Sequence, residues 1–197
     1  MKKGWYLLTY HDISWEENIY MKGIGGTCPP DIFEDQVKEL SKNGELVSFE
    51  EGLKRCNENN IKSPLFSFWF DDGFTGNRIY GKPILDKYNT TAASAVCSRF
   101  VLKKELFWCA KLSYIFYKGY MPILKNELYP LGYKNNVLVK NFTLNNFSLE
   151  ILSIIDNVYN EIKTEKERLS AFDLFDDIEG LRELKKAGWL ITIHSAA

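Results

Sequence analysis

Three side chains that could together perform metal-assisted hydrolysis stand at the ends of two apolar segments. Asp71 and Asp72 follow the apolar and aromatic run of residues 65–70, and His194 follows residues 189–193. Such a run is typical of a strand buried on both faces of a parallel sheet, and ligands gather beyond the carboxyl ends of these strands. Two carboxylates and a histidine can hold a divalent metal and leave one acid to take a proton from water, which suits amide or ester hydrolysis.

Each piece also has an ordinary structural interpretation. Asp71-Asp72-Gly73 is a common turn sequence, because Asp tolerates turn geometry and Gly adopts positive φ. A single histidine such as His194 is more often packed or exposed without any ligand role. The combination favours a site: two strands end in candidate ligands, and a helix that stops at Gly188 precedes the second.

The elements that must position these residues follow from the apolar pattern and the helix signals. Ser48 and Glu51 have the spacing of a capping box. We expect one α/β domain with a helical insertion at about 106–172. The expected strands are Trp5–Tyr10, 65–70, 91–97 and 189–193, and the expected helices are 30–40, 49–57, 78–88, 149–165 and 175–186.

Composition excludes several classes of protein. The chain has 197 residues, which suits one domain, and a formal charge of −1 without a basic stripe, so nucleic acid is not an expected partner. It has no apolar run of the roughly 18 residues that a membrane span needs. Its first apolar stretch is too short for a signal peptide, and its four cysteines are widely spaced, so we expect reduced thiols and a cytoplasmic location.

Several of these segments resemble one known family. Phe70-Asp71-Asp72-Gly73 resembles the F-D-D-G motif of the polysaccharide deacetylases, the NodB-homology carbohydrate esterases. Residues 184–195 are similar to the approach to that family's second motif, H-[ST]-x-x-H, with Ser195 at the [ST] position. The segment that ends in Tyr10-His11 is similar to the family's first strand.

The resemblance implies a fold, a reaction and roles. The fold would be a partial, distorted (β/α) barrel. Asp71 would be the catalytic base, and Asp72 and His194 would be ligands of a divalent metal, with zinc preferred. The reaction would remove acetyl groups from N-acetylated or O-acetylated saccharides of surface polysaccharide synthesis. Gly73 and Ser195 would stand at the edge of this site.

The same comparison identifies what is missing. The family's third ligand is the histidine four residues after the first, and the chain stops at Ala197, so we expect a fragment truncated within this motif. His11, the only other histidine, also ends a predicted strand and is either a replacement ligand or a substrate-facing or packed side chain. The alternative function is therefore a catalytically inactive fragment or remnant that binds a saccharide or a protein.

Overall fold

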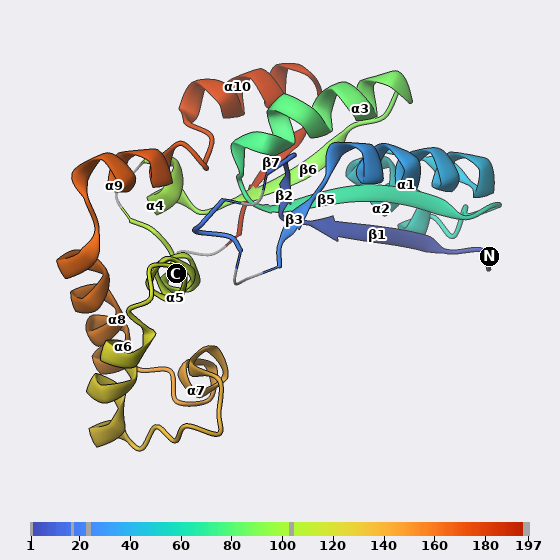
Figure 1. Ribbon diagram of the computed structural model, residues 1–197. Helices are drawn as coiled ribbons and strands as arrows, with labels where there is room; N and C mark the ends of the chain where they lie inside the picture. The colour runs from blue at the N-terminus through green and yellow to red at the C-terminus, as the bar shows by residue number, and fades with distance from the viewer. Residues whose placement is uncertain (1, 17, 23–24, 103–104, 195–197) are drawn as a thin grey trace. The chain divides into compact units, whose positions relative to one another are not determined.

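The computed structural model of the chain describes residues 2–16, 18–22, 25–102 and 105–194 (Figure 1). The chain divides into two compact units. The first comprises residues 1–16, 26–105 and 172–197, and the second comprises residues 17–25 and 106–171. The first unit carries the sheet, and the second is helical.

The first unit is built on a parallel sheet with the strand order β1-β5-β6-β7, in which β4 also pairs with the start of β5. Its strands are β1 (Trp5–Tyr10), β4 (Glu45–Leu46), β5 (Leu65–Asp72), β6 (Ala92–Val96) and β7 (Leu190–Ile193). Among the described strands this sheet is open at β1 and β7. A two-stranded parallel ribbon joins β2 (Asp12–Ile13) to β3 (Thr27–Cys28). The expected α/β class is confirmed.

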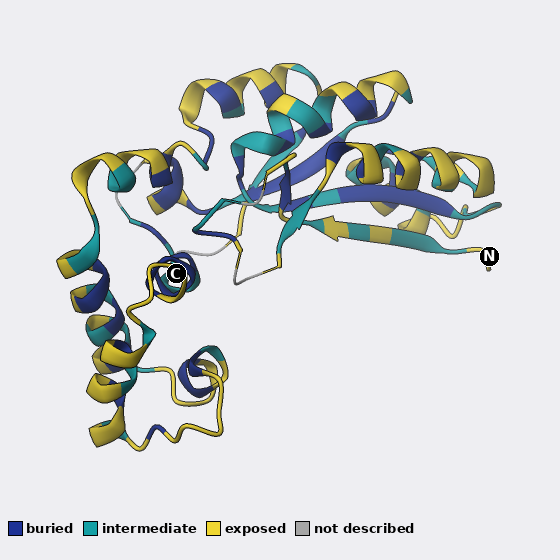
Figure 2. Cartoon of the chain, viewed as in Figure 1, coloured by how far each residue is buried: buried dark blue, intermediate teal, exposed yellow. Residues whose placement is uncertain are grey.

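Helices cover both faces of this sheet. On one face lie α1 (Pro30–Asn43), α3 (Lys82–Lys87) and α10 (Ile178–Lys186), whose buried sides turn toward the strands (Figures 1 and 2). The other face receives α2 (Phe49–Asn57), because the Phe49 ring lies 5.2 Å from that of Trp5 and 5.1 Å from that of Trp69. The remaining helical pieces are a π-helical turn at Asn77–Gly81 and α4 (Ser98–Val101).

The alternation of β5 divides its side chains between these two layers. Phe68 and Phe70 are fully buried against the α1 side, where the Phe33 ring lies 5.8 Å from each of theirs. Phe70 also stacks on Trp189 at 5.3 Å. Burying each phenylalanine contributes about 1.5–3 kcal/mol. A one-residue slip would expose these rings, so the register that places the end of β5 is strongly determined.

Local signals account for most element boundaries. The Ser48 hydroxyl accepts a hydrogen bond from the Glu51 N–H at 3.2 Å, which confirms the predicted cap of α2. The helix predicted from residue 175 begins instead at Ile178, because the Asp177 side chain caps it by accepting from the Gly180 N–H at 2.9 Å. Strand β5 continues two residues beyond the predicted end, since its acidic residues still pair with β6.

The second unit contains five α-helices among the described residues. They are α5 (Trp108–Tyr117), α6 (Met121–Leu128), α7 (Val139–Asn145), α8 (Leu149–Ile162) and α9 (Glu165–Phe172), with a 3₁₀ turn at Tyr129–Leu131. None of the described helices combines the length and apolarity that crossing a bilayer would require.

Tyr20, in the described segment 18–22, packs against these helices. Its ring stacks on that of Tyr114 at 5.0 Å, and its hydroxyl donates to the Glu167 carbonyl at 3.0 Å. The Tyr114 hydroxyl donates to the Glu167 carboxylate at 2.7 Å. That the helical region is an insertion within one domain stays a prediction.

Candidate active site

The two acidic residues form the carboxyl end of β5. Asp71 pairs with Ala95 and Asp72 with Val96 in the parallel ladder with β6. Asp72 has a φ of 67°, and Gly73, which follows it, has a φ of 76°. The chain therefore turns sharply away from the sheet as soon as it leaves the second carboxylate. Two consecutive residues of left-handed conformation favour glycine, and Gly73 provides it at one of them.

Close packing also selects glycine at position 73. A Cβ there would lie 2.9 Å from Cγ1 of Val96. The carbonyl of Gly73 accepts a hydrogen bond from the Asp176 N–H at 2.9 Å, and the next residue but one, Thr75, donates its N–H to Leu174 at 2.8 Å. The turn after the two acids is thus held by the segment that precedes α10.

His194 reaches the same edge of the sheet from β7. Its backbone N–H donates to the Val96 carbonyl at 3.0 Å, which continues the β6–β7 ladder by one residue. Its Nε2 lies 3.5 Å from Oδ1 of Asp71, and its Nδ1 lies 4.0 Å from Oδ1 of Asp72. The structure therefore brings together the three residues that the sequence singled out, with the imidazole beside both carboxylates. Ser195 lies outside the described residues.

Trp69 contacts the first of these acids, a relationship that the sequence analysis missed. Its indole Nε1 donates a hydrogen bond to Oδ1 of Asp71 at 2.8 Å. Residues two apart on a strand share a face, so the spacing itself could have indicated this contact. The Trp69 ring in turn packs on Phe49 of α2. The Asp71 carboxylate is thus oriented by a side chain that is itself held by packing.

The electrostatics of Asp72 differ from those of an exposed carboxylate. Burial raises the pKa of Asp72, and the nearby charges of His194 and His11 oppose that shift. The His11 side chain itself is exposed. Asn77 holds the His11 backbone, because its Nδ2 donates to the His11 carbonyl at 2.7 Å while its Oδ1 accepts from the Ile13 N–H at 3.2 Å. No sequence signal indicated this role for Asn77.

The two acids that precede α10, Asp176 and Asp177, have separate roles. Asp177 caps α10, as the preference for acids at helix N-termini indicates. Asp176 instead is buried, and its Oδ1 accepts from Nε of Arg78 at 2.8 Å. Asp176 is therefore not a simple helix-terminal acid, because burial requires that its charge be paired.

The donor types at the edge of the sheet suit a zinc ion in part. Carboxylate oxygen and imidazole nitrogen are both zinc donors, and donors on one tetrahedral zinc lie about 3.4 Å apart. The distance of 4.0 Å between Oδ1 of Asp72 and Nδ1 of His194 is slightly longer than this. Among the side chains that the structure describes, no group of three or more His, Cys, Asp and Glu residues is placed to hold a metal. The described residues thus fit two ligands of a metal site.

Comparison with solved structures finds several deacetylases that are similar to this chain. A de-N-acetylase from Aggregatibacter actinomycetemcomitans aligns with 98% of this chain and 55% of its own length, at 17% identity and a TM-score of 0.55. The deacetylase domain of BpsB from Bordetella bronchiseptica aligns over the same shares at 16% identity and a TM-score of 0.47. IcaB from Ammonifex degensii aligns with 58% of this chain and 49% of its own, at 16% identity and a TM-score of 0.43.

The first of these likenesses establishes the fold. This chain shares the α/β fold of that de-N-acetylase. It spans about half the length of that structure. Neither a family model nor the sequence of a curated protein matches this chain.

Proposed function

We propose that this chain provides the base and two metal ligands of a hydrolase that removes acetyl groups from N-acetylated or O-acetylated saccharides. The observation that carries the proposal is the meeting of Asp71, Asp72 and His194 at the carboxyl ends of neighbouring parallel strands. The de-N-acetylase fold supports the acetyl group as the group that hydrolysis removes from the saccharide. We also propose a cytoplasmic location and, from the family resemblance of the F-D-D-G motif, a place in surface polysaccharide synthesis.

Each side chain has a distinct task in this proposal. Asp72 and His194 would hold the metal, for which zinc is the preferred ion. When bound, such an ion lowers the pKa of water and polarises a carbonyl. Asp71, oriented by the Trp69 indole, accepts the proton of the attacking water. The bond from water oxygen to the acetyl carbon forms, the bond from that carbon to nitrogen or oxygen breaks, and the proton passes to the leaving amine or alkoxide. The products are acetate and the deacetylated saccharide.

The test is acetate release from N-acetylated sugar oligomers by the purified chain with added zinc or cobalt. Removing a general base costs about 10²–10⁴ in rate, so Asp71→Asn should lower kcat by this amount while metal affinity is retained. Glu58→Gln, at an exposed position at the end of α2, is the matched control and should leave the rate unchanged.

The outcomes separate the hydrolase from the binding-module alternative. Acetate release that depends on both metal and Asp71 supports the hydrolase. Saccharide binding without release under either metal, and without any effect of Asp71→Asn, would favour an inactive remnant. Release that persists in Asp71→Asn would refute the assignment of this residue as the base.

A further inference from the structure

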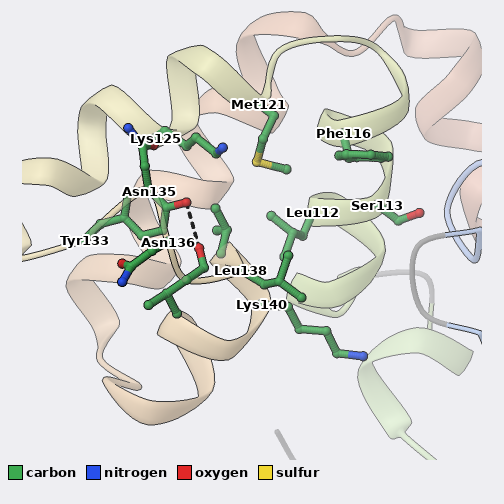
Figure 3. Close-up of a pocket in the computed structure, with 12 residues that line it drawn as sticks. Leu112, Ser113, Phe116, Met121, Lys125, Tyr133, Asn135, Asn136, Leu138 and Lys140 are labelled. Carbon is green, nitrogen blue, oxygen red and sulfur yellow. Dashed lines mark hydrogen bonds between the residues drawn. The ribbon is translucent and has the colours of Figure 1, made fainter.

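The helical unit contains a cavity of about 340 Å³ between α5, α6 and α7 (Figure 3). This volume falls near the lower end of the range for small-molecule sites, about 300–1,000 Å³. Aliphatic side chains make up much of its wall. In Figure 3, Leu112 of α5 and Met121 of α6 extend toward one another, and Leu138 approaches from the segment before α7. The interior therefore suits an apolar chain.

Two lysines are the charged groups among the residues that line this cavity, Lys125 from α6 and Lys140 from α7. Both are half-buried, and neither forms an ion pair with a carboxylate in the described part of the chain. In Figure 3 the Lys125 ammonium group extends toward Met121, while the Lys140 side chain runs outward from α7. The Tyr133 hydroxyl cannot donate to a ligand without losing a hydrogen bond, because it donates to the Val137 carbonyl at 2.9 Å. The cavity thus combines apolar walls with uncompensated positive charge.

Exposed apolar side chains and lysines are also frequent in the segments that form the cavity. Leu138 is 71% exposed and Phe116 is 55% exposed, although both line the cavity. More than half of the exposed large apolar side chains among the described residues fall within residues 116–149. Residues 106–149 contain five lysines and one glutamate. Lys111 and Lys118 pair with Asp156 and Glu167, which leaves Lys125, Lys134 and Lys140 without an ion pair among the described residues. Exposed apolar side chains that line a cavity favour an interaction site, and the lysines Lys125 and Lys140 favour a negative ligand.

We propose that this cavity binds an anionic amphiphile. Its apolar chain lies between Leu112, Met121 and Leu138, and its phosphate headgroup contacts Lys125, with Lys140 as a second cation at the rim. A saccharide fits less well, because the aliphatic wall would leave sugar hydroxyls without hydrogen-bond partners. The amphiphile can come from a bilayer or from solution. The proposal is independent of the acetyl-hydrolase site.

The probe for this proposal is dodecyl phosphate, used below its micelle-forming concentration and titrated calorimetrically into the full chain. We expect saturable binding, at least tenfold weaker binding of dodecyl maltoside, and no measurable binding of inorganic phosphate. Lys125→Gln should weaken dodecyl phosphate binding at least fivefold. Lys134→Gln is the control, because Lys134 is exposed in the same segment and does not line the cavity.

A second pair of variants tests the apolar wall. Leu138→Glu should weaken binding at least tenfold, whereas Leu144→Glu, at an exposed position outside the cavity, should leave it unchanged. Both side chains are exposed, so neither change should unfold the unit, and a circular dichroism melt verifies this. Absence of saturable binding, equal effects of the two glutamates, or equal effects of the two glutamines would overturn the proposal.

Sedimentation with vesicles of phosphatidylglycerol and phosphatidylcholine identifies the source of the ligand. Vesicle binding that dodecyl phosphate competes away and that Leu138→Glu abolishes supports the cavity as the site for a bilayer lipid. Binding of dodecyl phosphate without vesicle binding supports a free amphiphile. Vesicle binding that dodecyl phosphate does not reduce would contradict the cavity as the lipid site.

Discussion

The indole Nε1 of Trp69 donates a 2.8 Å hydrogen bond to Oδ1 of Asp71. Both side chains lie on the same face of β5, and the Trp69 ring packs on Phe49 of α2. The proposed base is therefore held by a donor whose own position depends on the fold. This arrangement separates the orientation of the base from the metal binding that we propose for Asp72 and His194.

Replacing Trp69 should therefore affect turnover more than metal affinity. Trp69→Phe keeps an aromatic ring against Phe49 but removes the donor to Asp71. A hydrogen bond to a charged group contributes about 1.5–3 kcal/mol, which corresponds to roughly a 10- to 100-fold loss in kcat. Separate kcat and KM values from acetate release, with zinc affinity measured alongside, test this expectation.

Trp5→Phe is the matched control for that experiment. The Trp5 indole also donates on this face of the sheet, but to the Ser67 hydroxyl at 2.9 Å. Its loss should reduce stability by about 0.5–1.5 kcal/mol and leave kcat unchanged. Equal kcat values for Trp69→Phe and the unmodified chain would show that the indole does not orient the base.

The turn at Gly73 should tolerate no side chain. Gly73→Ala combines a φ of 76° with a Cβ placed 2.9 Å from Cγ1 of Val96. The left-handed conformation costs about 1–2 kcal/mol for a residue with a Cβ, and the close contact adds to it. The free energy of unfolding in urea should therefore fall by more than 2 kcal/mol.

Gly188→Ala provides the comparison. Its backbone conformation is similar to that of Gly73, but a Cβ at Gly188 has more room. Its φ is 87°, and a Cβ there would lie 3.5 Å from Cγ2 of Thr91, an ordinary contact. Only the conformational cost of about 1–2 kcal/mol applies. A loss at Gly73 no larger than that at Gly188 would show that the approach of Val96 is unimportant.

Stability should depend on pH through Asp12. Burial raises the pKa of Asp12 from 3.8 to about 6. The folded state then binds a proton that the unfolded state releases, so the contribution to stability is present below about pH 4 and is lost as pH rises to about 6. A shift of about two units corresponds to at most about 3 kcal/mol.

Asp12→Asn should remove this dependence. Urea unfolding between pH 4 and pH 7 should show the difference in unfolding free energy between the unmodified chain and Asp12→Asn changing by on the order of 2 kcal/mol. Asp31→Asn, at an exposed position in the first turn of α1, is the control. Parallel pH profiles for the unmodified chain and Asp12→Asn would rule out a raised pKa at this residue.

Removing Arg78 should leave a buried charge without its partner. Asp176 is 2% exposed, and its Oδ2 has no hydrogen-bond partner among the described residues. Breaking a buried pair from one side costs about 3–5 kcal/mol, so Arg78→Met should be strongly destabilising. The loss should be greater at pH 7 than at pH 5, because burial raises the pKa of Asp176 to about 6 even beside Arg78.

Arg182→Met is the control for this loss. Arg182 pairs with Glu179 on the exposed side of α10, where such a pair contributes less than about 1 kcal/mol. Urea unfolding of both variants at the two pH values makes the comparison. Similar losses for Arg78→Met and Arg182→Met, or a loss at Arg78 that does not change with pH, would contradict a charged and buried Asp176.

The parts of the fold that the sequence could predict are those set by local signals. The apolar run before Asp71, the N-terminal cap at Ser48 and the strand before His194 all reappear in the structure. Contacts between segments that are distant in the sequence could not be predicted from it. Asn77 holds the His11 backbone across 66 positions, and no periodicity or motif encodes that contact. The pairing of Arg78 with Asp176 was missed for the same reason.

Zinc binding by the full chain tests the central claim most directly. Competition titration should show one zinc bound with equal affinity by the unmodified chain and by Asp71→Asn. Affinity should be at least tenfold lower for Asp72→Asn and for His194→Gln. A similar loss in His11→Gln would add His11 to the ligands. Zinc affinity unchanged in both Asp72→Asn and His194→Gln would contradict a metal site at the ends of β5 and β7.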